Sequence, residues 1–339
     1  MCLSKNNIFI LMKGLPIMTK KILILHTGGT ISMSEDESGK IKPNERNPLA
    51  NISLKNKSEL ELVTEEIFNV PSPHMNPERM LQLSLRIRQA EAEGFYGAVV
   101  THGTDTLEET AIFLDLTISS NMPVVVTGAM RSSNEIGSDG LYNFRTAIMV
   151  ASSKESVGKG VVVVMNDEIH SARYVTKTHT TNVATFRTPT FGPIGIVSEG
   201  HVNYVQTIKP QQHLPINYVV DQVFLVKAYA GMGTELFRAL NQTATNGIVI
   251  EALGAGNMPP ETLPELQALV EHKIPIVLVS RCFNGIAEPV YDYQGGGVNL
   301  NKMGIIYCRG LNGQKARIKL LVGLSAGLSG LELKKYINN

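Results

Sequence analysis

Two glycines flanked by threonines follow the first apolar run of the chain. Thr27, Gly28, Gly29 and Thr30 come soon after the run 22–25. Glycines lack a Cβ atom and permit tight turns, so a ligand can approach the main chain there. By itself, a Gly-Gly pair is more typical of a tight strand-to-helix turn. A dinucleotide-binding loop would need a third glycine and a phosphate-binding loop would need a lysine, and neither motif is found here.

A second stretch rich in hydroxyl groups follows the apolar run 98–101. Thr106 and Glu109 have the spacing of a capping box, which predicts a helix beginning at Thr106. Thr104 and Asp105 then lie in the loop before that helix. A single aspartate in such a loop is more often a turn or capping residue than a catalytic one. Two hydroxyl-rich loops at equivalent strand ends favour a shared ligand site, because open α/β sheets bind ligands at that edge.

The segment 174–181 adds Lys177, which lies among threonines beyond the apolar run 161–164. A single lysine is normally a solvated surface charge. Several histidines could suggest a metal site, but their spacings match no ligand motif, and structural histidines are the simpler interpretation. They are His26, His102, His170 and His179. The sequence therefore predicts no metal and no organic cofactor.

Short β-branched runs alternate with helical patterns along the chain, which is typical of βαβ units around a mostly parallel, buried sheet. The runs are 22–25, 98–101, 124–127, 161–164, 248–251 and 276–279. One helix is predicted in detail, with Asn76 as its N-cap and Pro77 as its first residue. Its buried face is expected to carry Met80, Leu83, Ile87 and Ala90.

Length and composition limit the remaining possibilities. A chain of 339 residues exceeds what one hydrophobic core usually organises, so we expect two domains. A net charge of +1, with dispersed lysines and arginines, argues against a nucleic-acid partner or an anionic lipid surface. No apolar run is long enough to span a bilayer. The three cysteines match neither a zinc site nor a disulfide framework, which indicates a reducing compartment.

The domain boundary is expected within residues 205–222, which lack sustained periodicity and carry two prolines. This linker would separate an N-terminal domain over 20–204 from a C-terminal domain over 223–339. Residues 1–19 are expected to be a disordered extension or to follow a mis-assigned start, because a second start-like sequence at Met18 directly precedes the first strand.

Four segments resemble signature segments of the bacterial L-asparaginase family and occur in the family's order. They are TGGTIS at 27–32, HGTDTLEETA at 102–111, TGAMRSSNEIGSDGLYNFRTA at 127–147 and VTKTHTTNVATF at 175–186. The resemblance extends from Lys20 onward. It implies a larger N-terminal flavodoxin-like domain with a mostly parallel sheet, a short linker and a smaller C-terminal α/β domain. It also implies a cytoplasmic enzyme that hydrolyses L-asparagine to L-aspartate and ammonia through a threonine acyl-enzyme. Weaker activity on glutamine is expected, because a pocket discriminates poorly against one methylene.

Carried over residue by residue, the resemblance makes Thr30 the nucleophile. It makes Thr104, Asp105 and Lys177 the second catalytic group. A carboxylate nearby favours the charged lysine, whereas burial favours the neutral amine, so the resting proton of Lys177 stays unassigned. We treat the three residues as one proton-handling unit.

The resemblance also implies a substrate-binding set, in which Ser72 holds the substrate α-carboxylate and Asp105 holds the α-ammonium. Backbone N–H groups near Gly29 and Thr104 are expected to stabilise the oxyanion. Family active sites are completed by the C-terminal domain of a neighbouring subunit, which implies a homotetramer, a dimer of intimate dimers. The residues matching that contribution, and completing the set, are Asn257 and Glu288.

Two positions depart from the family pattern. The flexible lid usually carries a tyrosine, but the stretch 32–54 contains none. Pro71 stands where relatives have glycine or aspartate, so side-chain help is absent at that point.

Two alternatives remain at this stage. The amidotransferase subunit that releases ammonia for tRNA-dependent amidation has similar catalytic motifs, but it carries an additional domain before the first strand. A catalytically dead amino-acid sensor would keep the pocket but would not require Lys177.

Overall fold

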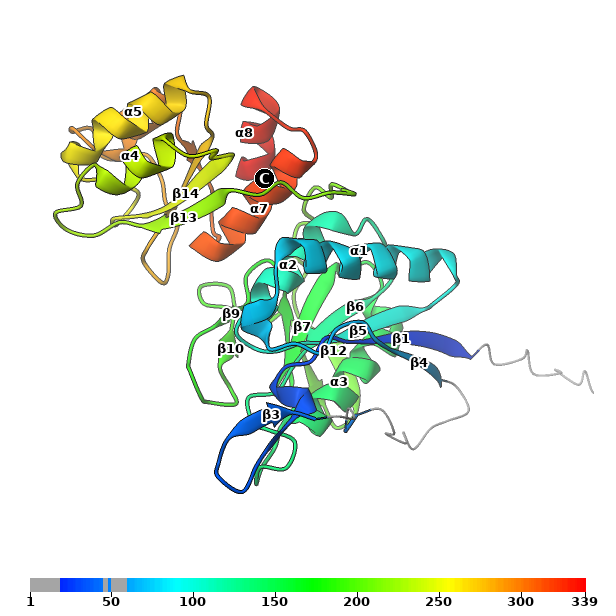
Figure 1. Cartoon of the computed structure of the whole chain (residues 1–339). Helices are drawn as coiled ribbons and strands as arrows, with labels where there is room; N and C mark the ends of the chain where they lie inside the picture. The colour runs from blue at the N-terminus through cyan, green and yellow to red at the C-terminus, as the bar shows by residue number, and fades with distance from the viewer. Residues whose placement is uncertain (1–18, 45–47, 50–59) are drawn as a thin grey trace, which may run out of the picture.

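An eight-stranded sheet organises the first part of the chain in the computed structural model, which describes residues 19–44, 48–49 and 60–339 (Figure 1). Its strand order is β12-β11-β8-β7-β6-β5-β1-β4. The strands are β1 (Lys20–His26), β4 (Leu60–Glu66), β5 (Gly97–Thr101), β6 (Val124–Thr127), β7 (Val161–Met165), β8 (Glu168–Ser171), β11 (Gly195–Ser198) and β12 (His201–Tyr204). Of the predicted extension, residues 1–18 lie outside the described part of the chain.

Five of these strands, β4, β1, β5, β6 and β7, run parallel. Numbered in chain order among themselves, they give the order 2-1-3-4-5, which is the flavodoxin-like order. The predicted flavodoxin-like parallel sheet is therefore confirmed. Strands β8, β11 and β12 extend it in antiparallel fashion, an edge that the sequence did not predict.

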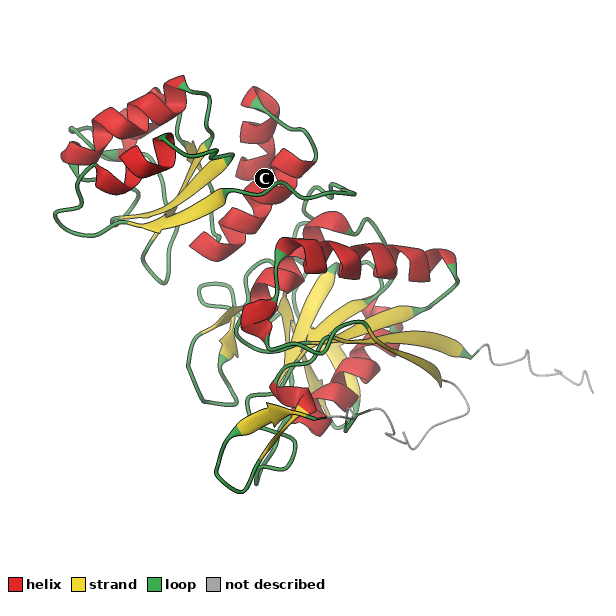
Figure 2. Cartoon of the chain, in the orientation of Figure 1, coloured by secondary structure: helices red, strands yellow, loops and turns green. Residues whose placement is uncertain are grey.

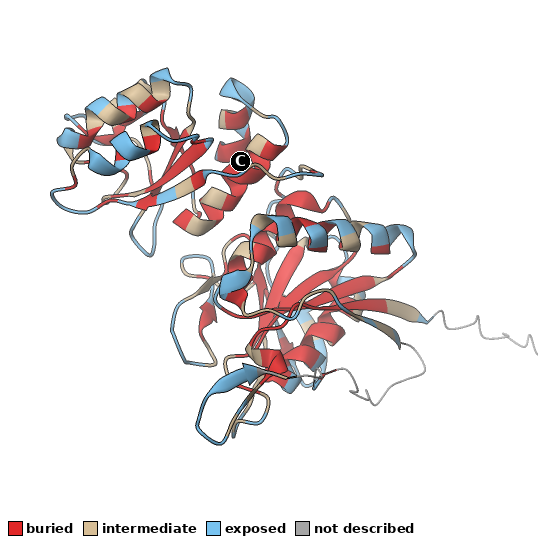
Figure 3. Cartoon of the chain, viewed as in Figure 1, coloured by how far each residue is buried: buried red, intermediate tan, exposed pale blue. Residues whose placement is uncertain are grey.

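Helices cover both faces of this sheet, namely α1 (Pro77–Ala92) and α2 (Leu107–Thr117) on one face and α3 (Gly140–Ser152) on the other (Figure 1). Leu23 and Leu25 pack toward α1 and α2, whereas Ile22 and Ile24 pack toward α3. Burial on both faces explains why the strands appear in the sequence as continuous apolar runs. Figure 3 shows the resulting buried interior.

Of the two helix N-termini predicted from the sequence, one has the predicted capping hydrogen bond and the other does not. Asn76 caps α1 as predicted, since its Oδ1 accepts from the backbone N–H of Arg79 at 2.9 Å. Thr106 is the N-cap residue of α2, but the predicted capping box is wrong. Its hydroxyl makes no capping hydrogen bond and donates instead to the carbonyl oxygen of Ser72 at 2.8 Å. Tertiary contact has replaced local capping at this position.

Residues 205–222 contain neither helix nor strand, and a smaller α/β unit follows them (Figure 2). Its four-stranded sheet has the order β13-β14-β15-β16, and all neighbouring pairs are parallel. The strands are β13 (Val223–Lys227), β14 (Gly247–Ala252), β15 (Ile276–Ser280) and β16 (Ile306–Tyr307), and the helices are α4 (Glu235–Asn241), α5 (Leu263–Glu271), α6 (Gly297–Met303), α7 (Gly313–Ser325) and α8 (Gly330–Asn338). The smaller C-terminal α/β unit is thus confirmed.

Helix α2 lies between the large sheet and the C-terminal unit, because α7 packs against its outer side (Figure 1). Ile112, Phe113 and Leu116 of α2 share one apolar cluster with Ile318 and Leu321 of α7. A helix that is apolar on all sides is normally buried, and α2 fits that description. The loop that precedes α2 is therefore anchored to both parts of the molecule.

Candidate active site

The two hydroxyl-rich loops predicted from the sequence meet where the strand order of the parallel sheet reverses. β1 lies between β4 and β5, so the loop after β1 and the loop after β5 leave adjacent strands at the same edge. Open α/β sheets bind ligands at such a switch point. The edge of the sheet at which the sequence predicts the site is thus the edge at which this strand order favours ligand binding.

Backbone contacts bring these loops unusually close together. A Cβ atom added to Gly29, whose φ is +81°, would lie 2.3 Å from the Cα of Gly103. A Cβ added to Gly103 would lie 2.7 Å from the Cβ of Ser72. Only glycine fits at either position without displacing the neighbouring loop. Gly103 therefore belongs to the site architecture, although the sequence alone did not single it out.

A cavity of about 420 Å³ opens between these loops, a volume suited to a small molecule. It brings together Thr30, the other predicted catalytic residues, Gly29 and Ser72. The lining residues are Gly29, Thr30, Met33, Ile41, Pro71, Ser72, Pro73, Gly103, Thr104, Asp105, Met130, Lys177 and Thr180. A single pocket therefore contains all the candidate residues that the N-terminal unit supplies.

Lys177 is the centre of the polar contacts in this cavity. Its Nζ donates to Thr104 Oγ1 at 2.9 Å and to Asp105 Oδ1 at 2.7 Å. The Lys177 side chain is 17% exposed and that of Asp105 is 60% exposed, so the ion pair reaches from the interior to the open side of the pocket. The backbone N–H of Asp105 donates to Ser72 Oγ at 3.2 Å. These contacts fix the carboxylate beside an amine and a hydroxyl.

Thr30 begins a single 3-10 turn, Thr30–Ser32, directly after the left-handed Gly29. Its side chain is half-buried and lines the cavity. Among the described residues, no hydrogen-bond partner is found for its hydroxyl group. That hydroxyl is therefore available to a bound substrate.

Lys177 lies in a short strand, although the sequence around it predicts no regular element. It is part of the two-residue strand β9 (Thr176–Lys177), which pairs with β10 (Phe186–Arg187) in antiparallel fashion. The sequence missed this strand because a two-residue element has no periodicity to detect. The sequence also missed Glu108, whose buried carboxylate accepts from the backbone N–H of Lys177 at 3.3 Å.

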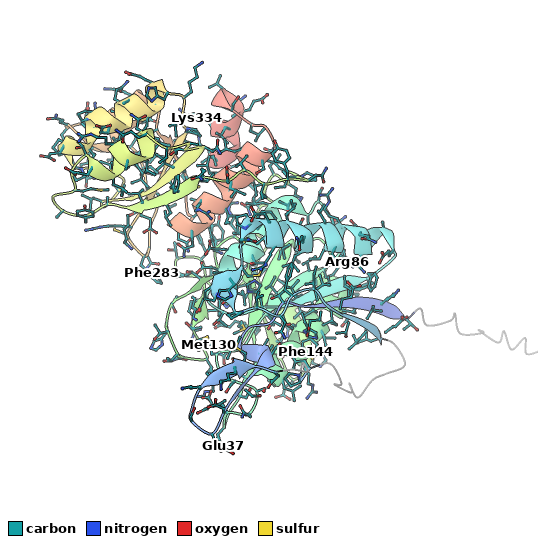
Figure 4. All side chains as sticks on the ribbon, viewed as in Figure 1. Glu37, Arg86, Met130, Phe144, Phe283 and Lys334 are labelled. Carbon is teal, nitrogen blue, oxygen red and sulfur yellow. The ribbon has the colours of Figure 1, made fainter. Side chains whose placement is uncertain are left out.

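A hairpin that turns two apolar side chains to the cavity forms its outer wall, where the family lid is expected. Its strands are β2 (Met33–Glu35) and β3 (Ile41–Pro43), and Met33 and Ile41 line the pocket. Figure 4 shows Glu37 at the tip of this hairpin and Met130 near its base. The described part of the predicted lid therefore presents aliphatic side chains, while residues 45–47 and 50–54 of that stretch are not described.

Asn257 and Glu288 do not line this cavity within the chain. Asn257 Oδ1 accepts from the backbone N–H of Gly297 at 3.1 Å. The backbone N–H of Glu288 donates to the carbonyl oxygen of Ala255 at 2.8 Å, which places the two candidates on neighbouring loops of the C-terminal unit. Within a single chain, Asn257 and Glu288 therefore lie outside the cavity that holds the other candidate residues.

Histidines near the site have structural contacts. Burial lowers the pKa of His26 and of His102 to about 4, so both rings are neutral near pH 7. His102 Nε2 lies 2.9 Å from Thr110 Oγ1, and its Nδ1 lies 2.7 Å from the carbonyl oxygen of Gly103. Within residues 19–44, 48–49 and 60–339, no group of three or more His, Cys, Asp or Glu side chains could hold a metal ion. No helix in those ranges is long and apolar enough to cross a membrane.

The fold and the cavity define a two-domain α/β protein whose pocket combines threonine hydroxyls with an amine and a carboxylate, a set able to transfer an acyl group to water. A family model described as "Asparaginase, N-terminal" matches residues 21–210. A second, "Glutaminase/Asparaginase C-terminal domain", matches residues 222–337. The chain belongs to the asparaginase family, as its motifs had indicated.

Individual relatives support the same assignment over nearly the whole chain. The L-asparaginase of Bacillus licheniformis is 35% identical over 94% of this chain and 99% of its own length. A probable L-asparaginase of Deinococcus radiodurans is 38% identical over 95% of this chain and 98% of its own length. The crystal structure of a probable cytoplasmic L-asparaginase from Campylobacter jejuni superposes with a TM-score of 0.80 at 33% identity, covering 94% of this chain and 99% of that one.

Proposed function

We propose that the chain is a cytoplasmic L-asparaginase that converts L-asparagine to L-aspartate and ammonia through an acyl-enzyme on Thr30. The observation that carries this proposal is the contact of Lys177 Nζ with both Thr104 Oγ1 and Asp105 Oδ1 in the cavity that Thr30 also lines. The names of the relatives support asparagine as the substrate. The description of the C-terminal family model, which includes glutaminases, supports a weaker reaction with glutamine.

In the proposed reaction, Thr30 Oγ1 attacks the side-chain amide carbon of asparagine and loses its proton. Backbone N–H groups near Gly29 and Thr104 stabilise the oxyanion. The C–N bond breaks as the amide nitrogen takes up a proton and leaves as ammonia. Water then attacks the ester, which releases aspartate and restores the Thr30 hydroxyl. The unit of Lys177, Asp105 and Thr104 accepts and returns the protons in these steps, and no metal or organic cofactor takes part.

Recognition of the amino acid follows from the charges in the pocket. The Asp105 carboxylate lines the cavity and its side chain is 60% exposed, so it can pair with the substrate α-ammonium. Ser72 is 5% exposed and can donate its hydroxyl hydrogen to the substrate α-carboxylate, while its oxygen still accepts from Asp105 N–H. Pro71 and Pro73 line the cavity beside it and have neither a backbone N–H nor a side-chain donor, which leaves Ser72 as the donor of that loop.

The proposed assembly is a homotetramer, a dimer of intimate dimers, in which Asn257 and Glu288 enter the pocket of a neighbouring subunit. The loop around Glu288 carries exposed large apolar side chains, as interaction surfaces do. They are Phe283 (64% exposed), Val290 (64%), Tyr291 (50%) and Tyr293 (54%). Figure 4 shows Phe283 at the end of the C-terminal unit that is nearer the N-terminal unit. Within each subunit, we propose residues 20–204 as the catalytic domain, 205–222 as the linker and 223–339 as the C-terminal domain.

An assay of ammonia release from L-asparagine, L-glutamine and D-asparagine tests the reaction. We expect the highest kcat/KM for L-asparagine. Trapping with a slow substrate, followed by peptide mapping, should place an ester on Thr30. An adduct only on Thr104 would reverse the roles of the two threonines. Binding of asparagine without any turnover would favour the sensor interpretation instead.

Light scattering tests the assembly, with a native mass about four times that of the monomer as the expected result. A fully active monomer would contradict the shared site. Fractionation of cells tests the proposed compartment, and recovery of the protein outside the cytoplasmic fraction would contradict it.

A further inference from the structure

Glu108 is a buried carboxylate in the first turn of α2, three residues after Asp105, and its side chain takes no direct part in the reaction proposed above. It is 4% exposed. Its Oε1 accepts from Thr176 Oγ1 at 3.0 Å and from the backbone N–H of Lys177 at 3.3 Å. Glu108 therefore holds both residues of strand β9.

The same carboxylate reaches the C-terminal unit. Glu108 Oε2 accepts from Asn312 Nδ2 at 3.0 Å, and Oε1 accepts from Gln314 Nε2 at 3.3 Å. Asn312 is the N-cap of α7, because its Oδ1 accepts from the backbone N–H of Lys315 at 3.1 Å. Asn312 Nδ2 also lies 3.3 Å from Thr176 Oγ1. One buried carboxylate thus joins α2, β9 and the start of α7.

Every partner that the described residues give the Glu108 carboxyl group donates a hydrogen bond to one of its two oxygens. Its place in the first turn of α2 adds the favourable effect of the helix N-terminus on a negative charge. The carboxylate is therefore a strong local anchor. Strand β9 needs such an anchor, since it is two residues long and, in the part of the chain that the structure describes, pairs with the equally short β10 alone.

The first turn of α2 and the loop before it contact Lys177 at both of its ends. Glu108 holds its backbone N–H, and Asp105 Oδ1 holds its Nζ. A lysine side chain is flexible and carries about 2 kcal/mol of rotamer entropy, so the position of its backbone decides how often Nζ reaches Thr104. A catalytic group displaced by about 1 Å loses much of its effect on rate.

We propose that Glu108 is the positioning residue of Lys177 and that, through Asn312, it makes the placement of the lysine amine depend on the packing of α7 against the N-terminal unit. This inference rests on the proposed function in taking Lys177 as a carrier of protons. Glu108 itself does not line the cavity that Thr30 and Lys177 share.

The test compares Glu108→Gln with Glu109→Gln in the full-length enzyme. Both changes replace a carboxyl in the same helical turn with an amide of the same shape, but Glu109 has no hydrogen bond to β9 among the described residues. We expect Glu108→Gln to lower kcat for L-asparagine at least about tenfold with KM within about threefold, the pattern of a lost transition-state interaction. Glu109→Gln should keep kcat within about twofold. An unchanged kcat in Glu108→Gln would overturn the proposal.

A second variant changes a residue of the C-terminal unit, so the proposal can still be tested if Glu108→Gln does not fold. Asn312→Ser keeps a good N-cap for α7 but replaces the amide Nδ2 that donates to Glu108 with a shorter hydroxyl group. It should lower kcat about threefold or more at unchanged KM, with a far-UV spectrum like that of the parent. Loss of activity only in proportion to loss of folded protein would contradict positioning.

Lys177→Met separates this proposal from the proposed function. When Lys177→Met is strongly impaired, adding Glu108→Gln should cause little further loss, because both changes remove the same contribution. Fully additive losses would show that Glu108 acts elsewhere and would overturn the proposal alone. Full turnover by Lys177→Met would overturn the role of the lysine, and the positioning role with it.

Discussion

Replacing Lys177 with methionine should lower kcat strongly but reduce the free energy of unfolding only slightly. Methionine keeps the approximate length of the side chain but has no amine to contact Thr104 Oγ1 and Asp105 Oδ1. With the Asp105 side chain 60% exposed, the lost ion pair contributes only about 0.2–1 kcal/mol to stability. The hydrogen bond to Thr104 adds about 0.5–1.5 kcal/mol. Release of the ordered lysine side chain offsets part of both contributions.

The net cost in unfolding free energy should therefore be about 1 kcal/mol, or a fall in Tm of about 1–2 °C for a chain of 339 residues. The effect on catalysis should be much larger. Loss of a general acid–base group typically lowers kcat about 10²–10⁴-fold. At about 1.36 kcal/mol per tenfold, this is about 2.7–5.4 kcal/mol of activation free energy. Substrate affinity should stay within about tenfold, because Ser72 and Asp105 remain in place.

Steady-state ammonia release and thermal unfolding, measured on the same preparations, test whether kcat falls strongly while Tm falls only slightly. Lys227→Met is a matched control, since Lys227 Nζ lies 3.3 Å from Glu251 Oε2 and its side chain is 66% exposed. Its kcat should match that of the parent. The double variant Thr30→Ala, Lys177→Met should be little worse than Thr30→Ala, because residues acting as a unit are not additive. A loss in kcat below about tenfold for Lys177→Met in a folded protein would refute the reasoning.

Three further predictions follow from the site and the core. Gly103→Ala would place a Cβ 2.7 Å from the Cβ of Ser72, so activity should fall at least about tenfold, and an unchanged KM and kcat would show that the loops can separate. Dialysis against EDTA should leave full activity, and a loss restored by one divalent ion would contradict the proposal of a metal-free site. Burial lowers the pKa values of His26, His102 and His170 from 6.5 to about 4, so the unfolded chain binds more protons in that range. Stability should therefore decline as the pH falls from 6.5 toward 4, and a constant Tm over that window would exclude this contribution.

The elements that could be predicted from sequence are those determined by local patterns. The N-cap Asn76, the proline after it and a periodic apolar face gave α1, and continuous β-branched runs gave the parallel strands. The residues at the strand ends, Thr30 and Thr104, could be placed at one edge because parallel strands end together. Their meeting in one cavity follows from the same rule.

Features determined by tertiary contacts could not be predicted in this way. Thr106 has the sequence of a capping residue, but its hydroxyl bonds to Ser72, which is distant in the chain. Lys315 is a surface type of residue, but in α7 it is 1% exposed and its Nζ donates to the carbonyl oxygen of Ala172. Burial lowers its pKa to about 8. Glu108 left only a faint signal, because it follows Asp105 by three residues and lies in the first turn of the helix that the Asp105 loop leads into.

The proton-handling residues and the β2–β3 hairpin differ in how firmly the surrounding structure holds them. Asp105 and Thr104 precede a helix that is packed on one side by the sheet and on the other by α7, so little of their support can move. The β2–β3 hairpin is instead joined to the loop after β6 by surface contacts, including the bond of Glu35 N–H to Asn134 Oδ1 at 2.8 Å. Exposed backbone hydrogen bonds and few buried contacts characterise segments that open at low cost. Because Ile41 lines the cavity and is 50% exposed, we expect substrate to enter past this hairpin while the amine and carboxylate stay fixed.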